Sequence, residues 1–141
     1  MEPRQMPQVF QWETAALPVL GSIKMPIAEV FLRNASGEWR KFFPVVDSGA
    51  AISFFSKSEC EFLGYPFDAG DYCELTSLSG HAIPCRIHKV PMKVGTEVIE
   101  AMIAFSDTLP HKQYLGRISV FENFEINFRG RVSTTTFVRE V

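Results

Sequence analysis

The stretch Phe43-Pro-Val-Val-Asp47-Ser-Gly-Ala-Ala-Ile-Ser-Phe-Phe55 places one carboxylate between two apolar runs. A carboxylate between two core strands costs free energy unless it is paired or hydrogen-bonded. Asp-Ser-Gly is also ordinary turn chemistry, because Asp accepts local backbone hydrogen bonds and Gly readily adopts positive φ. Residues 47–49 are therefore either a plain turn or a functional loop.

A second segment favours the functional loop. Tyr114-Leu-Gly-Arg117 is followed by residues 120–128, Val-Phe-Glu-Asn-Phe-Glu-Ile-Asn-Phe. Together, the two segments resemble the active-site loop and the later apolar-Gly-Arg element of the retropepsin-like aspartic proteases, the family of retroviral proteases and their cellular relatives. The resemblance covers about residues 27–130. It implies an all-β fold, a retropepsin-like closed β-barrel with one or two short helices and one lobe per chain.

The length of the chain sets the number of lobes. At 141 residues the sequence accommodates one domain with a single core. Two-lobed, pepsin-like enzymes carry two Asp-[Ser/Thr]-Gly loops in one chain, whereas the nearest second candidate here, Asp68-Ala-Gly70, lacks the hydroxyl. If the chain is an aspartic protease, its second carboxylate must come from another copy, and a symmetric homodimer follows.

The resemblance also implies an activity and a set of site residues. The activity would be that of an aspartic endopeptidase, which hydrolyses peptide bonds with a water activated between two Asp47 carboxylates and needs no cofactor or metal. Asp47, Ser48 and Gly49 would be the catalytic residues. An extended peptide or protein substrate would lie under a flap formed by the hairpin at 78–81. The substrate-binding residues would be Ala50, Ala51, Leu78, Ser79, Gly80, His81 and Arg117.

The sequence departs from the family's pattern at Ala51. Many retroviral members have an Asp there, which receives substrate backbone and pairs with the Arg of the later Gly-Arg motif. Arg117 thus lacks its expected partner, and it must find another acid or stay hydrated. Two other functions stay open. One is a homodimeric retropepsin-fold module that binds peptides or proteins with little or no catalysis, and the other is a monomeric interaction domain in which Asp47 only caps a loop.

Turn residues and alternating patterns divide the rest of the chain. We expect an extended N-terminal arm over residues 1–26 that packs on a protease domain at 27–141. Strands at 27–33 and 39–46 should form a hairpin that delivers Asp47, with Asn34 in its turn rather than serving as a glycosylation site. A helix capped by Ser56 and Glu59 should end at Leu63–Gly64. Further strands are expected around 72–75, 83–94, 98–105 and 125–128, with a helical turn at 120–124 and an extended tail at 132–141.

Charge and hydropathy exclude several classes of partner. A formal net charge of −2, with both signs interspersed, gives no electrostatic support for nucleic acid binding. No apolar run approaches the length of a membrane span, and the N-terminus lacks the regions of a signal peptide. We therefore expect a cytoplasmic protein with neither a nucleic acid nor a membrane partner.

The cysteines and histidines do not predict a metal site or a disulfide framework. Cys60, Cys73 and Cys85 are odd in number and lack metal-ligand spacing, so we expect reduced thiols, with Cys60 in the core. On a strand, His81 and Cys85 would share one face while His88 points to the other, so these three side chains do not converge.

Overall fold

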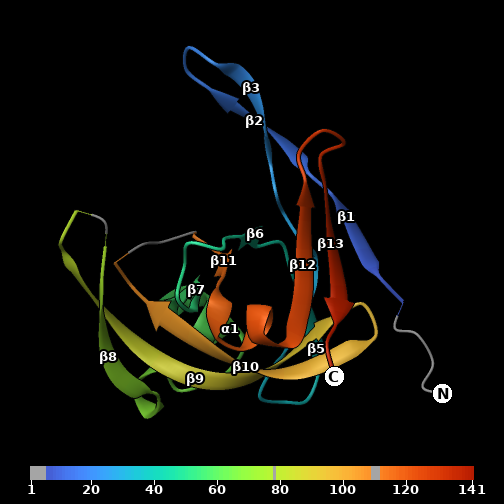
Figure 1. Ribbon diagram of the computed structural model, residues 1–141. Coiled ribbons are helices and arrows are strands. Elements are labelled where there is room, and N and C mark those ends of the chain that lie inside the picture. The colour runs from blue at the N-terminus through green and yellow to red at the C-terminus, as the bar shows by residue number, and fades with distance from the viewer. Residues whose placement is uncertain (1–5, 78, 109–111) are drawn as a thin grey trace.

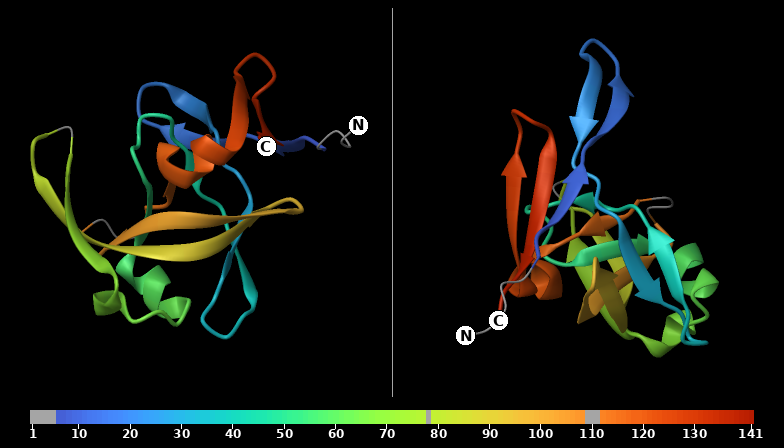
Figure 2. Two further views of the ribbon diagram at one scale, coloured as in Figure 1. Left: turned by 60° about the horizontal axis from the view of Figure 1, so that its bottom comes forward. Right: turned by 90° about the vertical axis from the view of Figure 1, so that its right-hand side faces the viewer.

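The computed structural model describes residues 6–77, 79–108 and 112–141. Most of this chain is strand, which confirms the all-β prediction, and the helical segments are short. A large curved sheet forms a half-barrel, a three-stranded sheet of terminal strands stands beside it, and a two-stranded hairpin projects from the body (Figures 1 and 2).

The strands and helical segments follow one another in a simple order. The strands are β1 (Gln8–Gln11), β2 (Glu13–Leu17), β3 (Gly21–Met25), β4 (Val30–Arg33), β5 (Trp39–Phe42), β6 (Val45–Val46), β7 (Ser53–Ser56), β8 (Asp71–Thr76), β9 (Ala82–Val94), β10 (Glu97–Ser106), β11 (Tyr114–Leu115), β12 (Phe124–Arg129) and β13 (Thr134–Arg139). The helical segments are α1 (Lys57–Phe62), η1 (Phe67–Ala69) and η2 (Arg117–Phe121).

The large sheet is built on the long β9–β10 hairpin. Its strand order is β5-β4-β9-β10-β7-β11-β6, and β8 pairs with the first half of β9. β9 and β10 pair continuously from Val94↔Glu97 to Arg86↔Phe105, and the turn between them contains Gly95 at φ +59. In Figure 1 these two strands curve beneath the other elements. The buried apolar residues form a large cluster and a smaller one, which contains Ile52, Phe54, Cys85 and Ala104.

Aromatic side chains fill much of the large cluster. Phe55 and Phe105 are fully buried, and Phe42 meets Phe55 edge to face with ring centroids 5.6 Å apart. Buried aromatic rings supply large apolar area, and edge-to-face contacts add to it. Cys60 is 0% exposed among these residues, which confirms its predicted place in the core.

Helix α1 begins as the sequence predicts. The Oγ of Ser56 accepts a hydrogen bond from the Glu59 backbone N–H at 3.3 Å, and Oε1 of Glu59 accepts one from the Ser56 N–H at 2.9 Å. This reciprocal pair satisfies two of the free N–H groups at a helix start. Leu63 ends the helix, and Gly64 follows in the left-handed region at φ +83.

The predicted strand at 39–46 is interrupted at Phe43 and Pro44, between β5 and β6. β5 pairs with β4 only as far as Phe42, and the turn before it is held by the Asn34 side chain, which accepts from two backbone N–H groups. Pro44 has no N–H to donate to a continuing ladder. After it, Val45 in β6 still bridges Ile27 antiparallel, as the predicted hairpin requires, and β6 also pairs in parallel with β11, so a separate short strand delivers Asp47.

The N-terminal arm is partly a hairpin rather than an extended segment. β1 pairs with β13, and Phe10 packs against the main core. β2 and β3 pair only with each other and project from the body, with most of their side chains exposed (Figure 1). Leu17, Val19 and Leu20 form an exposed apolar tip. The division of the chain at residue 26 stays a prediction.

The C-terminal segment differs from its predicted form at Phe124. The helical turn η2 begins earlier, at Arg117, and Ile118 and Ser119 within it have non-helical backbone angles. Phe124 already belongs to β12, where it pairs with Arg139 and packs against Phe137. The helical spacing of apolar residues predicted a helix as far as Phe124, but pairing with β13 makes this residue part of a strand. β13 itself lies within the predicted extended tail.

Candidate active site

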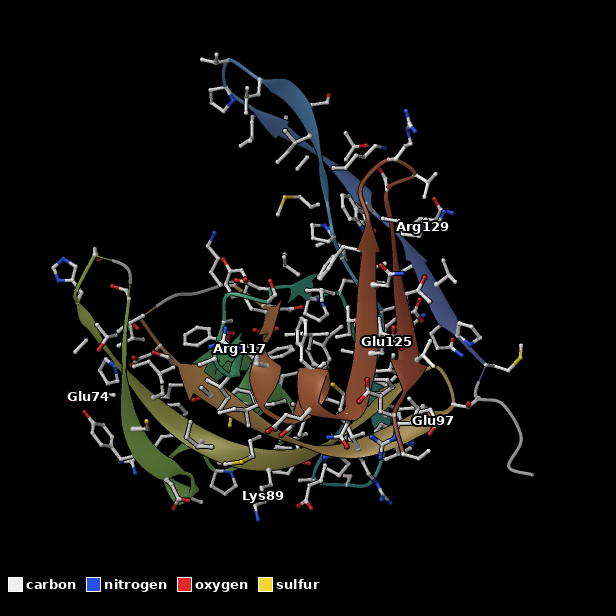
Figure 3. The ribbon with its side chains drawn as sticks, viewed as in Figure 1. Glu74, Lys89, Glu97, Arg117, Glu125 and Arg129 are labelled. Carbon is white, nitrogen blue, oxygen red and sulfur yellow. The ribbon has the colours of Figure 1, made fainter. Side chains whose placement is uncertain are left out.

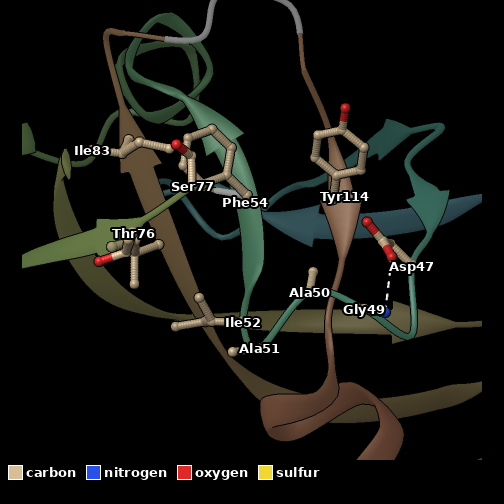
Figure 4. A pocket seen from close by; sticks show the side chains of 11 residues that line it. Asp47, Gly49, Ala50, Ala51, Ile52, Phe54, Thr76, Ser77, Ile83 and Tyr114 are labelled. Atoms are coloured by element: carbon tan, nitrogen blue, oxygen red, sulfur yellow. Dashed lines mark hydrogen bonds between the residues drawn. The ribbon is translucent and has the colours of Figure 1, made fainter. Parts of the chain in front are cut away.

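Asp47 lies at the end of β6 in a tight loop that leads to β7. Its backbone N–H donates to the Leu115 carbonyl at 3.0 Å, and its own carbonyl accepts from the Ala50 N–H at 3.2 Å. The carboxylate is half-buried, and its Oδ1 accepts the Gly49 N–H at 2.9 Å, while the other oxygen points away from Gly49 (Figure 4). The Asp-Ser-Gly turn thus orients the Asp47 carboxylate: the Gly49 N–H holds Oδ1, and the second oxygen is not part of this hydrogen bond.

The loop after Asp47 passes around β11. β6 pairs with β11 in parallel, and β7 pairs with β11 antiparallel from the opposite side. The two strands that flank Asp47 are therefore separated by a third strand from much later in the chain. The position of the carboxylate depends on this insertion, because β11 supplies the ladder for both ends of the loop.

Residues 117 and 118 hold the outer side of the same loop. The Arg117 N–H donates to the Ala50 carbonyl and the Ile118 N–H to the Ala51 carbonyl, each at 2.9 Å. The guanidinium of Arg117, labelled in Figure 3, donates through Nη1 to the Ser48 carbonyl at 2.6 Å. Arg117 therefore binds a carbonyl of the Asp47 loop instead of a second acid, and its side chain remains exposed.

Gly116 is required by the close approach of two backbones. A Cβ at this position would lie 2.4 Å from the Ile52 carbonyl carbon and 2.5 Å from its oxygen. The Gly116 N–H also donates to the buried Ser53 Oγ at 3.0 Å. Only glycine leaves room for this close contact between the two backbones.

A pocket of about 570 Å³ opens beside Asp47. Its walls are mostly apolar and come from the Asp47 loop, from β7, from β11 and from the β8–β9 hairpin (Figure 4). An apolar pocket with one well-placed ionisable group is the usual form of a ligand site. The lining residues are Asp47, Gly49, Ala50, Ala51, Ile52, Phe54, Leu75, Thr76, Ser77, Ile83 and Tyr114.

The β8–β9 hairpin lines this pocket with residues of its two strands and with Ser77 at the start of its turn. In the turn, the Ser77 N–H donates to the His81 carbonyl at 2.9 Å, and Gly80 has φ +85. Ser79, Gly80 and His81 are exposed and outside the pocket lining, and Leu78 lies outside the described residues. Leu75, Thr76, Ser77 and Ile83 line the pocket instead.

The structure thus brings together part of the predicted site. Asp47, Gly49, Ala50 and Ala51 share the pocket, whereas Ser48 is exposed beside it and Arg117 lies behind the loop. Sequence reasoning missed the walls formed by Leu75, Ile83 and Tyr114. The sequence signals for these residues were the apolar alternation of the two hairpin strands and the aromatic residue two positions before the Gly-Arg pair. These patterns do not say which side chains face Asp47.

His81, His88 and the three cysteines, all within the described residues, form no metal site there. Among residues 6–77, 79–108 and 112–141, no group of three or more His, Cys, Asp or Glu side chains is placed to hold an ion. Nε2 of His88 lies 3.0 Å from the Phe67 carbonyl and 3.9 Å from the Cys60 sulfur. Burial raises the pKa of the Cys60 thiol to about 11, so this cysteine is not an activated nucleophile.

No helix in the described part of the chain has the length and apolar character needed to cross a membrane.

Comparison with known proteins identifies the fold. No protein-family model and no curated protein matches the chain. Among solved structures, a retropepsin-like aspartic protease from Rickettsia conorii is similar, with a TM-score of 0.59 and 17% identity over 96% of this chain and 99% of that one. The chain has the retropepsin fold. The EIAV protease, solved with the inhibitor HBY-793, is also similar, with a TM-score of 0.51 and 18% identity over 73% of this chain and 88% of that one.

The retropepsin fold confirms the architecture that the two sequence motifs predicted. In this chain the loop at 47–52 and the Gly116-Arg117 pair, which carried the resemblance, contact each other directly.

We predict that Gly116→Ala destabilises the protein by about 1–3 kcal/mol, because the new methyl group meets backbone atoms that cannot move independently. Urea unfolding would measure the loss. Gly130→Ala is the matched control, because a Cβ there meets only the Trp12 ring at 4.0 Å. Equal stability of the two variants would contradict the close approach described for Gly116.

Proposed function

We propose that this protein is an aspartic endopeptidase that works as a homodimer. The observation that carries the proposal is the half-buried Asp47 carboxylate, held by the Gly49 N–H beside an apolar pocket in a retropepsin fold. Of the described residues that line the pocket, only Asp47 and Tyr114 have ionisable side chains. The chemistry of the site therefore depends on a carboxylate.

One carboxylate is not sufficient for this chemistry. Peptide hydrolysis by an activated water needs a base for the water and an acid for the developing oxyanion. A second copy of the chain supplies the second Asp47 when the two loops meet at a two-fold axis. The exposure of Ser48 and Gly49 in the single chain is compatible with such a contact.

The two carboxylates share one proton, because like charges at close range cannot both ionise. The ionised Asp47 takes a proton from the water, whose oxygen forms a bond to the peptide carbonyl carbon. The protonated Asp47 donates to the carbonyl oxygen, giving a neutral tetrahedral diol. Proton transfer to the nitrogen then accompanies breakage of the C–N bond, which releases an amine and a carboxylic acid. This route has no covalent enzyme intermediate.

The surrounding loop serves to keep the carboxylates in place. The Gly49 N–H fixes one Asp47 oxygen, and Arg117 holds the Ser48 carbonyl from behind. The Ser48 hydroxyl is available to bond to the other loop across the axis. Fixed donors of this kind need no reorganisation during the reaction, which is how preorganised sites lower a barrier.

The substrate would be an extended peptide or protein segment in the apolar pocket. Ala50 and Ala51 give it a small-residue floor, and the β8–β9 hairpin covers it as a flap, with Gly80 allowing its tip to move. Ser79, Gly80, His81 and Leu78 would contact substrate only after such closure. Arg117 acts through the loop and is better described as a positioning residue.

The absence of a carboxylate at position 51 favours a second candidate function. A homodimer with the same pocket could bind extended peptides without useful turnover, because Ala51 offers no acceptor to substrate backbone. A catalytic assay of an Asp47 variant separates the two functions.

We predict that Asp47→Asn keeps the fold and lowers peptide cleavage by at least about 100-fold, because an amide accepts the Gly49 N–H but cannot act as a base. The measurement is cleavage of a mixed peptide library at mildly acidic and neutral pH. Asp68→Asn is the matched control, since Asp68 is exposed on η1 outside the pocket. Undiminished turnover in Asp47→Asn would end the protease proposal, and binding without any cleavage by wild type would favour the binding module.

We also predict that Ala51→Asp is tolerated and lowers KM more than it changes kcat, because the carboxylate dyad is untouched. Ala51 is exposed, and its carbonyl already accepts the Ile118 N–H, next to Arg117. A double-mutant cycle of Ala51→Asp with Arg117→Gln should show coupling of up to about 1 kcal/mol, the size of an exposed ion pair. Absence of coupling between positions 51 and 117, or an Ala51→Asp variant that does not fold, would contradict the predicted contact between a carboxylate at position 51 and the Arg117 guanidinium.

A further inference from the structure

Two of the three cysteines face each other across the β8–β9 hairpin. Cys73 and Cys85 are register partners in this antiparallel pair. Directly opposed side chains lie on the same face of a sheet, with Cα atoms roughly 4.5–5.5 Å apart. A disulfide spans Cα separations of about 4.4–6.8 Å, so this pair meets the distance requirement without movement of the strands.

The pair lies on the inner face of the hairpin, next to the pocket. Leu75 and Ile83 are the next register partners on the same face, and both line the pocket beside Asp47. Cys85 is 1% exposed and packs with Ile52 and Phe54. The two cysteines thus occupy the stem of the hairpin, one step from its pocket-lining residues.

The three thiols differ in access to a reagent. Cys73 is half-buried, so a small molecule in solution reaches its sulfur, whereas Cys85 is shielded. Burial and the neighbouring Cys73 raise the pKa of Cys85 to about 11. Cys60 is 0% exposed within α1, where its sulfur contacts the Tyr65 carbonyl at 3.5 Å. Cys60 is buried in a different hydrophobic cluster from Cys85 and serves as an internal reference.

We propose that Cys73 and Cys85 form a reversible cross-strand disulfide in exchange with a low-molecular-weight disulfide. The Cys73 thiolate attacks the reagent, forms a mixed disulfide and releases one small thiol. Cys85 then loses its proton and attacks the Cys73 sulfur, which releases the second small thiol. The two protein thiols are oxidised, the reagent is reduced to two thiols, and an excess of small thiol reverses both steps.

The bond would join the two strands at the base of the hairpin. It closes a loop that contains the pocket-lining residues Leu75, Thr76, Ser77 and Ile83, and it limits how far the strands can separate or twist. If the hairpin is the flap of a peptidase, which rests on the proposed function, oxidation slows peptide turnover by restricting flap movement.

Oxidised glutathione is the probe for the covalent step. We expect the wild-type protein to lose two of its three titratable thiols, with a mass decrease equal to two hydrogen atoms and one peptide crosslink between Cys73 and Cys85. Cys60→Ala should form the same crosslink, whereas Cys73→Ala and Cys85→Ala should not. Dithiothreitol should restore all thiols.

Three outcomes would overturn the pairing. They are a stable glutathione adduct on Cys73 alone, a disulfide between two chains on a non-reducing gel, and no change in thiol count under conditions that oxidise an unfolded control. Circular dichroism of Cys85→Ala verifies that a negative result does not come from misfolding.

A separate assay compares peptide turnover of the oxidised and reduced protein, with Cys60→Ala as the matched control. Slower turnover that dithiothreitol reverses supports restriction of the flap, and equal turnover overturns it. A protein that forms the crosslink but cleaves no peptide in either state counts against the proposed function alone. A protein that cleaves peptides but forms no crosslink counts against the disulfide alone.

Discussion

The close contact between Gly116 and Ile52 is the constraint on which the rest of the site depends. It allows β11 to lie between β6 and β7, so that the two strands flanking Asp47 are joined through a segment from the far end of the chain. The β11–η2 segment then supplies the hydrogen bonds that hold the loop, to the carbonyls of residues 48, 50 and 51. Placing a carboxylate next to an apolar pocket costs free energy. Here the surrounding backbone fixes the position of the Asp47 carboxylate.

The same arrangement explains how one loop serves both structure and chemistry. Oδ1 of Asp47 caps the turn through the Gly49 N–H, while the second oxygen is directed away from that bond. The guanidinium of Arg117 stabilises the loop by donating to the Ser48 carbonyl.

Local rules predicted much of this from the sequence. The Asp47-Ser-Gly turn and the Ser56–Glu59 capping box each follow from chemistry within a few residues, and the structure has them where they were expected. Gly116 was singled out only through the family resemblance, because its contact with Ile52 joins segments far apart in the chain. The features that were missed depend on partners far along the chain. Pro44 separates β5 from β6 because β11 offers a new ladder, and Leu75 and Ile83 reach the pocket through the curvature of the long sheet. Neither partner nor curvature is encoded in a local pattern.

Subunit mixing tests whether each active site of the proposed dimer needs Asp47 from two chains. Wild-type and Asp47→Asn chains would be mixed at fixed total concentration, allowed to exchange, and assayed for peptide cleavage. If both carboxylates are required, activity follows the square of the wild-type fraction, so an equal mixture retains about one quarter. Retention of about one half, in proportion to the wild-type fraction, would show that one chain suffices and would contradict the account.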